Sequence, residues 1–387
     1  MMAMYTRLLT LPTQSFFLLG PRGTGKTTWL KSVLPGSKYF DLLRSTEHIR
    51  LMRNPDEFRQ EIAALKKGSW VVVDEIQKLP ILLDEIHSIM NDFPKQYNFA
   101  LSGSSARKLK RSGVNLLAGR AINRHLLPLT GSEMNYDFHE EDIVKYGMLP
   151  AVRNLSHDHD RVDFLDAYIA NYLQEEIQQE ALVKNLASFT RFLSVASLFH
   201  GQVTNVAGIA RDAGVQRPTV QGYFDVLTDT LIGRWLPAWT PRMKVKEKVH
   251  PKFYFFDPGV VQSISPKSQD FNTSDRRGFF IESIVMNELL AAKYYHGIKG
   301  EFYYWSTPSG TEVDFIWKGL KSSIGIEVKA TKQWKTSYGN PLRELHAEKF
   351  IDREFGVYLG ERILKDNNVW IFPLKEFMKK CASADLW

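Results

Sequence analysis

The sequence predicts an α/β protein: a parallel sheet behind a glycine-rich loop, then a helical middle region, then a second α/β region. Three observations support this fold class. A short apolar segment at residues 16–19 leads into a glycine-rich loop and a helical pattern. The uninterrupted apolar run at residues 70–73 is typical of a strand buried on both faces of a parallel sheet. Near the other end, residues 311–317 and 324–330 alternate apolar and charged side chains as strands do.

Length and composition limit the classes of protein to consider. The 387 residues leave room for two or three domains, and the formal net charge of +7 favours an acidic partner, nucleic acid first and an anionic membrane surface second. Cys381 is the single cysteine, so neither a disulfide framework nor a cysteine zinc site is possible, which fits a reducing cytoplasm. Because the sequence has no 18-residue apolar run and no apolar run near residue 1, we expect neither a membrane span nor a signal peptide.

The glycine-rich loop follows the pattern G-x-x-x-x-G-K-T, with a strand before it and a helix after it. Its glycines let backbone N–H groups converge on phosphate oxygens, and the N-terminus of the helix adds a favourable dipole. We expect Lys26 to reach the β- and γ-phosphates of ATP and Thr27 to bind Mg²⁺. The expected nucleotide-binding residues are Gly20, Pro21, Arg22, Gly23, Thr24, Gly25, Lys26, Thr27 and Thr28.

Two acidic residues follow the second apolar strand. Asp74 is expected at the end of that strand beside the phosphate loop, where its carboxylate would bind Mg²⁺ through water. Glu75 would then polarise the attacking water as a general base. A further strand at residues 97–101 leads to Ser102 and Ser104, either of which could sense the γ-phosphate, and Ser104 is taken as the candidate.

The segments GPRGTGKTT, VVVDEIQKLP and LSGSSARKL together resemble a prokaryotic family of AAA+ P-loop ATPases. In that family the ATPase is fused to a poorly understood C-terminal domain. The resemblance implies a homo-oligomer in which an arginine after the sensor strand completes a neighbouring subunit's site. Arg120 is the best match for this arginine and Arg124 the second. The alternative for either is a surface salt bridge.

A helix-turn-helix is predicted in the middle region. Ala210, Gly214 and Val220 have the spacing A-x3-G-x5-V, in which a small residue, a turn glycine and an inward apolar residue let two helices cross closely. The second helix would present Gln216 and the candidate DNA-binding residues Arg217, Thr219 and Gln221 outward. The alternative is a winged-helix module that serves as a lid or a docking surface.

A basic segment at residues 240–252 follows the predicted helix-turn-helix and is expected to form an exposed loop. Its alternating lysines suit a row of DNA phosphates, and Lys244, Lys246 and Lys248 are the candidate contacts. Lys252 lies at the end of the same segment. The alternative is an edge strand that its lysines protect from pairing.

The last third has the order helix, three strands, helix and strand, which resembles the PD-(D/E)XK nuclease fold, a restriction-endonuclease-like α/β domain. In a hairpin of residues 311–330, Asp314 would approach Glu327, whose side chain shares a strand face with Lys329. The resemblance implies that Glu282, Asp314 and Glu327 bind Mg²⁺ and that Lys329 orients the attacking water. Such domains either cut DNA or only bind it, and two amphipathic strands with solvent-facing charges are the simpler alternative.

Together these patterns predict three parts: an ATPase domain at residues 1–135, a helical lid with a winged helix-turn-helix at 136–250, and a nuclease-like domain at 251–387. The expected function is ATP hydrolysis coupled to action on DNA, with a C-terminal domain that cuts or grips a DNA structure. One alternative is a regulatory ATPase whose nucleotide state switches a docking platform. Another is an ATPase that acts on proteins.

Overall fold

The computed structural model describes residues 5–104, 117, 119–178, 183–241, 249–266 and 274–387. Two compact units are present: one contains residues 9–127 and 229–231, and the other contains residues 1–8, 128–228 and 232–387. None of the helices in the described ranges is long and apolar enough to cross a membrane.

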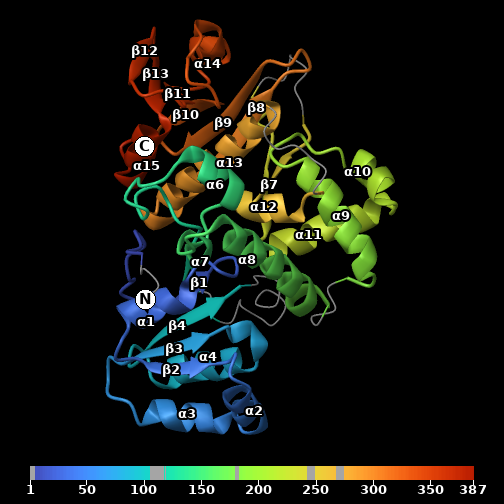
Figure 1. The fold of residues 1–387 in the computed structure, drawn as a ribbon. Coiled ribbons are helices and arrows are strands. Elements are labelled where there is room, and N and C mark those ends of the chain that lie inside the picture. The colour runs from blue at the N-terminus through green and yellow to red at the C-terminus, as the bar shows by residue number, and fades with distance from the viewer. Residues whose placement is uncertain (1–4, 105–116, 118, 179–182, 242–248, 267–273) are drawn as a thin grey trace. The chain divides into compact units, whose positions relative to one another are not determined.

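A five-stranded sheet with the order β2-β3-β4-β1-β5 forms the centre of the first unit, and all its pairings are parallel. Figure 1 shows β3 lying between β2 and β4, as the pairing requires. Three consecutive valines make β3 apolar on both faces, and their side chains are buried as predicted. The strands are β1 (Phe16–Leu19), β2 (Lys38–Asp41), β3 (Trp70–Asp74), β4 (Asn98–Gly103) and β5 (Ile122–His125).

Helices of the first unit alternate with these strands, which gives the α/β class that the sequence predicts. Phe17, Phe40 and Val73 of the sheet form one apolar core with Phe58 of α3 and Ile86 of α4. The helices are α1 (Lys26–Val33), α2 (Ser45–Arg53), α3 (Asp56–Ala63) and α4 (Leu82–Asp92), with a 3₁₀ turn at Ile76–Lys78.

The second unit begins with a group of helices that share one apolar core. Three of them begin at a side-chain cap: Asn185 accepts a hydrogen bond from the Ser188 N–H at α9, Asn205 accepts one from the Gly208 N–H at α10, and Asp257 accepts one from the Val260 N–H at α12. The helices are α6 (Glu140–Tyr146), α7 (Pro150–Arg153), α8 (Asp158–Asn171), α9 (Leu186–Leu198), α10 (Val206–Ala213), α11 (Arg217–Asp229) and α12 (Pro258–Ile264), with a π-helical segment at Tyr172–Gln178.

The predicted helix-turn-helix is α10 and α11. Gly214 ends α10 with a φ of 66°, a left-handed conformation that glycine adopts without strain, and residues 214–216 form the turn. Ala210 and Val220 are buried, as the spacing predicts. A two-stranded antiparallel sheet of β6 (Gly233–Leu236) and β7 (Lys252–Phe255) follows.

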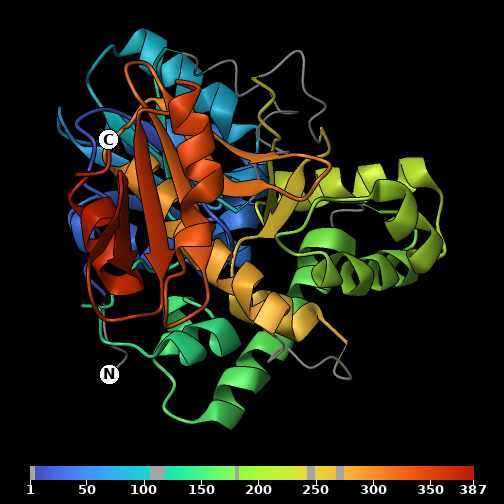
Figure 2. The same ribbon diagram turned by 90° about the horizontal axis from the view of Figure 1, so that it is seen from above.

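The C-terminal part of the second unit is a mixed six-stranded sheet with the order β12-β13-β11-β10-β9-β8. Figure 2 shows these orange and red strands side by side. The predicted order of helix, three strands, helix and strand is confirmed. The elements are α13 (Ser274–Tyr295), β8 (Gly300–Ser306), β9 (Glu312–Gly319), β10 (Ser323–Lys329), a 3₁₀ turn (Thr336–Gly339), α14 (Asn340–Ala347), β11 (Arg353–Tyr358), β12 (Leu364–Asp366), β13 (Val369–Pro373) and α15 (Leu374–Ala382).

The predicted boundary at residue 250 falls between two paired strands. β6 and β7 are antiparallel partners, with Gly233 opposite Phe255 and Leu236 opposite Lys252. The compact unit likewise runs across residue 250 without a division. The division into three parts stays a prediction, and in the structure the middle and C-terminal parts form one packed body.

Candidate functional site

The phosphate loop connects the end of β1 to the start of α1. Gly23 and Gly25 have φ angles of 83° and 90°, which a residue with a side chain rarely adopts, and this brings the loop backbone around the start of the helix. Lys26 is only 5% exposed, and its ammonium donates to the carbonyls of Gly20 at 2.9 Å and Pro21 at 3.2 Å. The loop therefore holds its lysine inside the concave side where phosphate would bind.

Asp74 at the end of β3 is the centre of a buried hydrogen-bond group. Thr27 donates to its Oδ2 at 2.7 Å, Tyr39 of the neighbouring strand donates to the same oxygen at 2.5 Å, and Ser102 at the end of β4 donates to its Oδ1. Parallel pairing of β2, β3 and β4 explains the convergence, because their carboxyl ends lie at one edge of the sheet.

The residues beside the loop fit a magnesium ion. Thr27 Oγ and Asp74 Oδ2 are adjacent oxygen donors, and Mg²⁺ in nucleotide sites is bound by one or two such groups together with phosphate oxygens and water. Burial and the nearby Asp74 carboxylate raise the pKa of Tyr39, so its hydroxyl remains a donor to Asp74 at physiological pH.

Glu75 follows Asp74 in a left-handed conformation, with a φ of 59° that is uncommon for a residue with a side chain. Its carboxylate accepts a hydrogen bond from Ser104 at 3.0 Å and another from the Gln77 amide. Lys26 Nζ lies 4.0 Å from the other carboxylate oxygen of Glu75. The general-base candidate is thus held in place by its own turn, the end of β4 and the loop lysine.

The two candidate sensor serines have different contacts. Ser102 binds Asp74 and also accepts the Glu75 backbone N–H at 2.9 Å, whereas Ser104 binds the Glu75 side chain. Ser104, the residue chosen from the sequence, is therefore the serine beside the general-base candidate. Tyr39 and Gln77 were missed by sequence reasoning, although Gln77 lies two residues after Glu75 in the same turn.

The remaining predicted residues of this site have less specific surroundings. Thr24 is buried and donates to the Pro21 carbonyl at 2.9 Å, so it stabilises the loop from within. Thr28 is exposed on α1. Arg120 is exposed and donates to Asn91 at 2.8 Å, and Arg124 lies on β5, so a role for either in a neighbouring subunit's site stays a prediction.

A second set of candidate residues lies in the C-terminal sheet. β9 and β10 pair antiparallel with Phe315 opposite Ile326, so the predicted hairpin is confirmed and Asp314 lies beside Glu327. Asp314 Oδ2 accepts the Val328 backbone N–H at 2.8 Å. Lys329 forms an ion pair with Glu327 and lies over the ring of Tyr338. Asp314 and Glu327 are therefore buried and partnered, unlike the charges of a solvent-facing strand.

Lys252 brings an unexpected positive charge to the same group. Only 1% of it is exposed, which corrects the sequence-based expectation that it ends an exposed basic loop. Its ammonium lies 2.5 Å from Glu312 Oε1, 3.6 Å from Glu282 Oε2 and 3.9 Å from Asp314 Oδ1. Tyr254, two residues along the same strand, donates to Glu282 at 2.9 Å. Period-two alternation puts both side chains on one face of β7.

Burial sets the electrostatics of this carboxylate group. Burial, and then the charge of Asp314, raise the pKa of Glu282 to about 8 against the opposing effect of Lys252. Burial and Asp314 also raise the pKa of Glu327 well above its usual range. Within the described ranges, no group of three acidic, histidine or cysteine side chains is close enough to hold a metal ion. Glu282, Asp314 and Glu327, which the sequence predicts as metal ligands, therefore lie near one another but are not arranged as a set of metal ligands.

The candidate DNA-binding residues divide into two groups. Arg217, Thr219 and Gln221 are exposed on α11, whose opposite face is buried through Val220 and Phe224. They form an outward-facing polar surface, as the helix-turn-helix prediction requires. Lys244, Lys246 and Lys248 lie outside the described residues.

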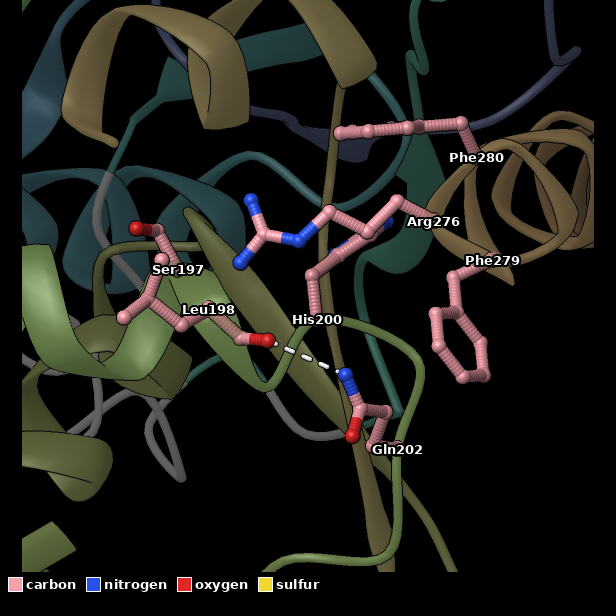
Figure 3. A pocket seen from close by; sticks show the side chains of 7 residues that line it. All are labelled: Ser197, Leu198, His200, Gln202, Arg276, Phe279 and Phe280. Carbon is pink, nitrogen blue, oxygen red and sulfur yellow. Dashed lines mark hydrogen bonds between the residues drawn. The ribbon is translucent and has the colours of Figure 1, made fainter. Parts of the chain in front are cut away.

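A small pocket lies between the end of α9 and the start of α13 (Figure 3). His200 lines it and is 3% exposed, with its ring stacked on Phe280 at 5.5 Å between ring centres. The Phe255 backbone N–H donates to His200 Nδ1 at 3.2 Å, so the neutral ring carries its proton on Nε2. Burial lowers the pKa of His200 to about 3, so the ring is neutral in the folded protein.

This buried histidine predicts a loss of stability in mild acid. Because its folded pKa lies below the ordinary value of about 6.5, the unfolded chain takes up the proton first, and stability falls as the pH drops below 6.5. Asparagine at this position keeps an acceptor for the Phe255 N–H but does not titrate. Between pH 6.5 and 5, wild type should lose about 1.5 kcal/mol more unfolding free energy than His200→Asn.

Urea unfolding of both proteins at several pH values measures this difference. The transition to follow is the one whose midpoint differs between wild type and His200→Asn at pH 7. Other titrating groups, such as the buried Asp257, are common to both proteins and cancel in the difference. Parallel pH profiles for the two proteins would contradict the neutral, buried state of His200.

Three family models match successive segments of the chain. Residues 13–135 match an AAA domain, residues 139–270 a domain of unknown function (DUF8612), and residues 277–377 another (DUF4143). With the parallel sheet and the loop geometry described above, the first match supports a P-loop ATPase domain of the AAA class at residues 13–135.

Similar proteins extend the comparison beyond this domain. Two proteins described as uncharacterized, Mb2031c of Mycobacterium bovis and Rv2008c of Mycobacterium tuberculosis, are each 25% identical over 348 residues, covering 89% of this chain and 76% of theirs. Among solved structures, the Aeropyrum pernix ORC2 protein in ADPNP–ADP complexes has a TM-score of 0.38 at 10% identity, covering 65% of this chain and 87% of that one. Cdc6p of Pyrobaculum aerophilum has a TM-score of 0.26 at 13% identity, covering 65% and 86%.

Proposed function

We propose that the protein hydrolyses ATP with the help of Mg²⁺ at the P-loop site and uses the nucleotide cycle to act on DNA. The observation that carries the enzymatic part is the convergence of Lys26, Thr27, Asp74 and Glu75 at one edge of the parallel sheet. A lysine, a hydroxyl and two carboxylates in this arrangement supply every group that phosphoryl transfer to water requires from one chain.

Each residue has a distinct role in this proposal. Lys26 exchanges the carbonyls of Gly20 and Pro21 for phosphate oxygens when nucleotide enters. Thr27 and Asp74 would hold Mg²⁺, which would neutralise phosphate charge. Glu75 takes a proton from the attacking water, and Ser104 at 3.0 Å links its carboxylate to the end of β4. Arg120, or Arg124, supplies a positive charge to the site of a second copy in a homo-oligomer.

The DNA part of the proposal rests on the second unit. Helices α9, α10 and α11 followed by the β6–β7 sheet have the order of a winged helix-turn-helix, in which the last helix enters the major groove. Arg217, Thr219 and Gln221 are exposed on that helix and carry the hydrogen-bonding groups that contact phosphates and base edges. The net charge of +7 favours the same partner.

Arg217→Ala should weaken binding to duplex DNA by about tenfold, within the cost of about 1–3 kcal/mol for one arginine contact. Fluorescence anisotropy with a labelled duplex at fixed salt measures the effect. The control is Lys321→Ala, which removes one positive charge from the exposed turn between β9 and β10 of the same unit. Equal affinity of wild type and Arg217→Ala would favour a docking role for α11.

In this proposal the C-terminal sheet binds DNA or a partner without cutting DNA. The reason is that the Lys252 ammonium lies within 4 Å of Glu282 and Asp314, two of the residues that a catalytic metal would need as ligands. The same observation favours the second candidate, a regulatory ATPase whose nucleotide state switches a binding platform. ATP turnover measured with and without duplex, forked and single-stranded DNA separates the two. An ATP turnover rate that DNA increases supports the first function. A turnover rate that DNA does not change supports the second candidate, a regulatory ATPase that binds proteins.

A further inference from the structure

We propose that the side chain of Lys252 takes the place of a divalent cation in the nuclease-like sheet, so that the group formed by Glu282, Glu312 and Asp314 holds an internal ammonium instead of a catalytic metal. This inference does not depend on ATP hydrolysis or on DNA binding, and it concerns only residues of the second unit.

The position of the ammonium is the first argument. Its nitrogen lies within 4 Å of a carboxylate oxygen from each of three residues, at 2.5 Å from Glu312, 3.6 Å from Glu282 and 3.9 Å from Asp314. A divalent cation bound by Glu282 and Asp314 would have to lie about 2.0–2.6 Å from their oxygens. Because the ammonium already lies within 4 Å of both carboxylates, such an ion would lie close to it, and the two positive charges would repel each other.

The remaining bonds of the carboxylates are the second argument. Glu282 accepts the Tyr254 hydroxyl at 2.9 Å, and Asp314 accepts the Val328 N–H at 2.8 Å. Glu327, the third predicted metal ligand, is paired with Lys329. Protein donors thus already hold one oxygen of each of these three carboxylates.

The origin of Lys252 is the third argument. It comes from β7, which pairs with β6 outside the six-stranded sheet, and Tyr254 from the same strand contacts the same glutamate. Two side chains from one face of β7 therefore contact Glu282 of α13, and Lys252 also contacts β9. Lysine side chains usually keep their ammonium group in water. Because Lys252 is only 1% exposed, its ammonium is instead a fixed part of the interior of this unit.

Manganese titration of the nucleotide-free, full-length protein tests the inference. Wild type and Asp314→Asn should give the same Mn²⁺ binding by electron paramagnetic resonance, because the cluster offers no metal site to lose. Asparagine keeps the acceptor for the Val328 N–H, so the variant should fold. A Mn²⁺ site that is present in wild type and missing in Asp314→Asn would overturn the proposal.

Removing the lysine should create a metal site. Lys252→Ala removes the ammonium that Glu282, Glu312 and Asp314 share, so these carboxylates can close on a cation. Millimolar Mn²⁺ or Ca²⁺ should therefore raise the melting temperature of this variant by several degrees more than it raises that of wild type. Lys252→Ala with Asp314→Asn should lose most of this effect, and sodium chloride of equal ionic strength should not reproduce it. A folded Lys252→Ala protein with no metal-dependent shift would contradict the inference. If that variant fails to fold, the comparison of wild type with Asp314→Asn decides alone.

Discussion

Replacing Lys26 with alanine should reduce ATP turnover by at least about 10²–10³-fold, the cost of removing one preorganised charge-stabilising group from a reaction centre. The lysine is 5% exposed, and both of its described hydrogen bonds go to carbonyls of its own loop. Its ammonium is therefore held where the β- and γ-phosphates would lie, and alanine leaves the loop without that charge.

Phosphate release at saturating ATP and Mg²⁺ measures this effect, and circular dichroism with thermal unfolding checks that the fold is retained. The matched control is Lys67→Ala, which removes an exposed lysine from the same unit and should leave turnover unchanged within a factor of two. Wild-type turnover by a folded Lys26→Ala protein would remove the loop from the mechanism.

The parts of this site that the sequence predicts best are those contiguous in the chain. The loop from Gly20 to Thr27 and the pair Asp74–Glu75 each follow a short sequence pattern in which the residue types match the nucleotide or metal contacts they are expected to make. Tyr39 and Ser102 reach Asp74 from two other strands. Their roles depend on which strands become neighbours in the sheet, and local patterns do not determine strand order.

The C-terminal region shows the same division between local and long-range information. Alternation in residues 311–330 predicts two strands and the approach of Asp314 to Glu327, and the antiparallel register confirms both. The position of Lys252 could not be predicted, because the 240–252 segment is rich in lysine and its last member turns inward only through the packing of β7 against α13. Strand alternation places Lys252 and Tyr254 on one face, but it does not say that this face is covered.

Replacing Glu75 with glutamine should separate ATP binding from ATP hydrolysis. Glutamine has nearly the same shape, and its carbonyl oxygen can still accept the Ser104 hydroxyl that contacts Glu75 at 3.0 Å. It cannot take a proton from water. The rate of hydrolysis should therefore fall by about 10²–10⁴-fold, while nucleotide affinity changes by less than about threefold.

Two measurements distinguish this outcome from a general loss of structure. Calorimetric titration with a non-hydrolysable ATP analogue reports affinity, and single-turnover phosphate release reports the chemical step. Asp84→Asn on the exposed face of α4 is the matched control, since it removes one carboxylate from the same unit without touching the site. Normal turnover by Glu75→Gln would place the general base elsewhere. Loss of nucleotide affinity together with turnover would mean that Glu75, with its φ of 59° and its contact to Lys26, shapes the loop rather than activating water.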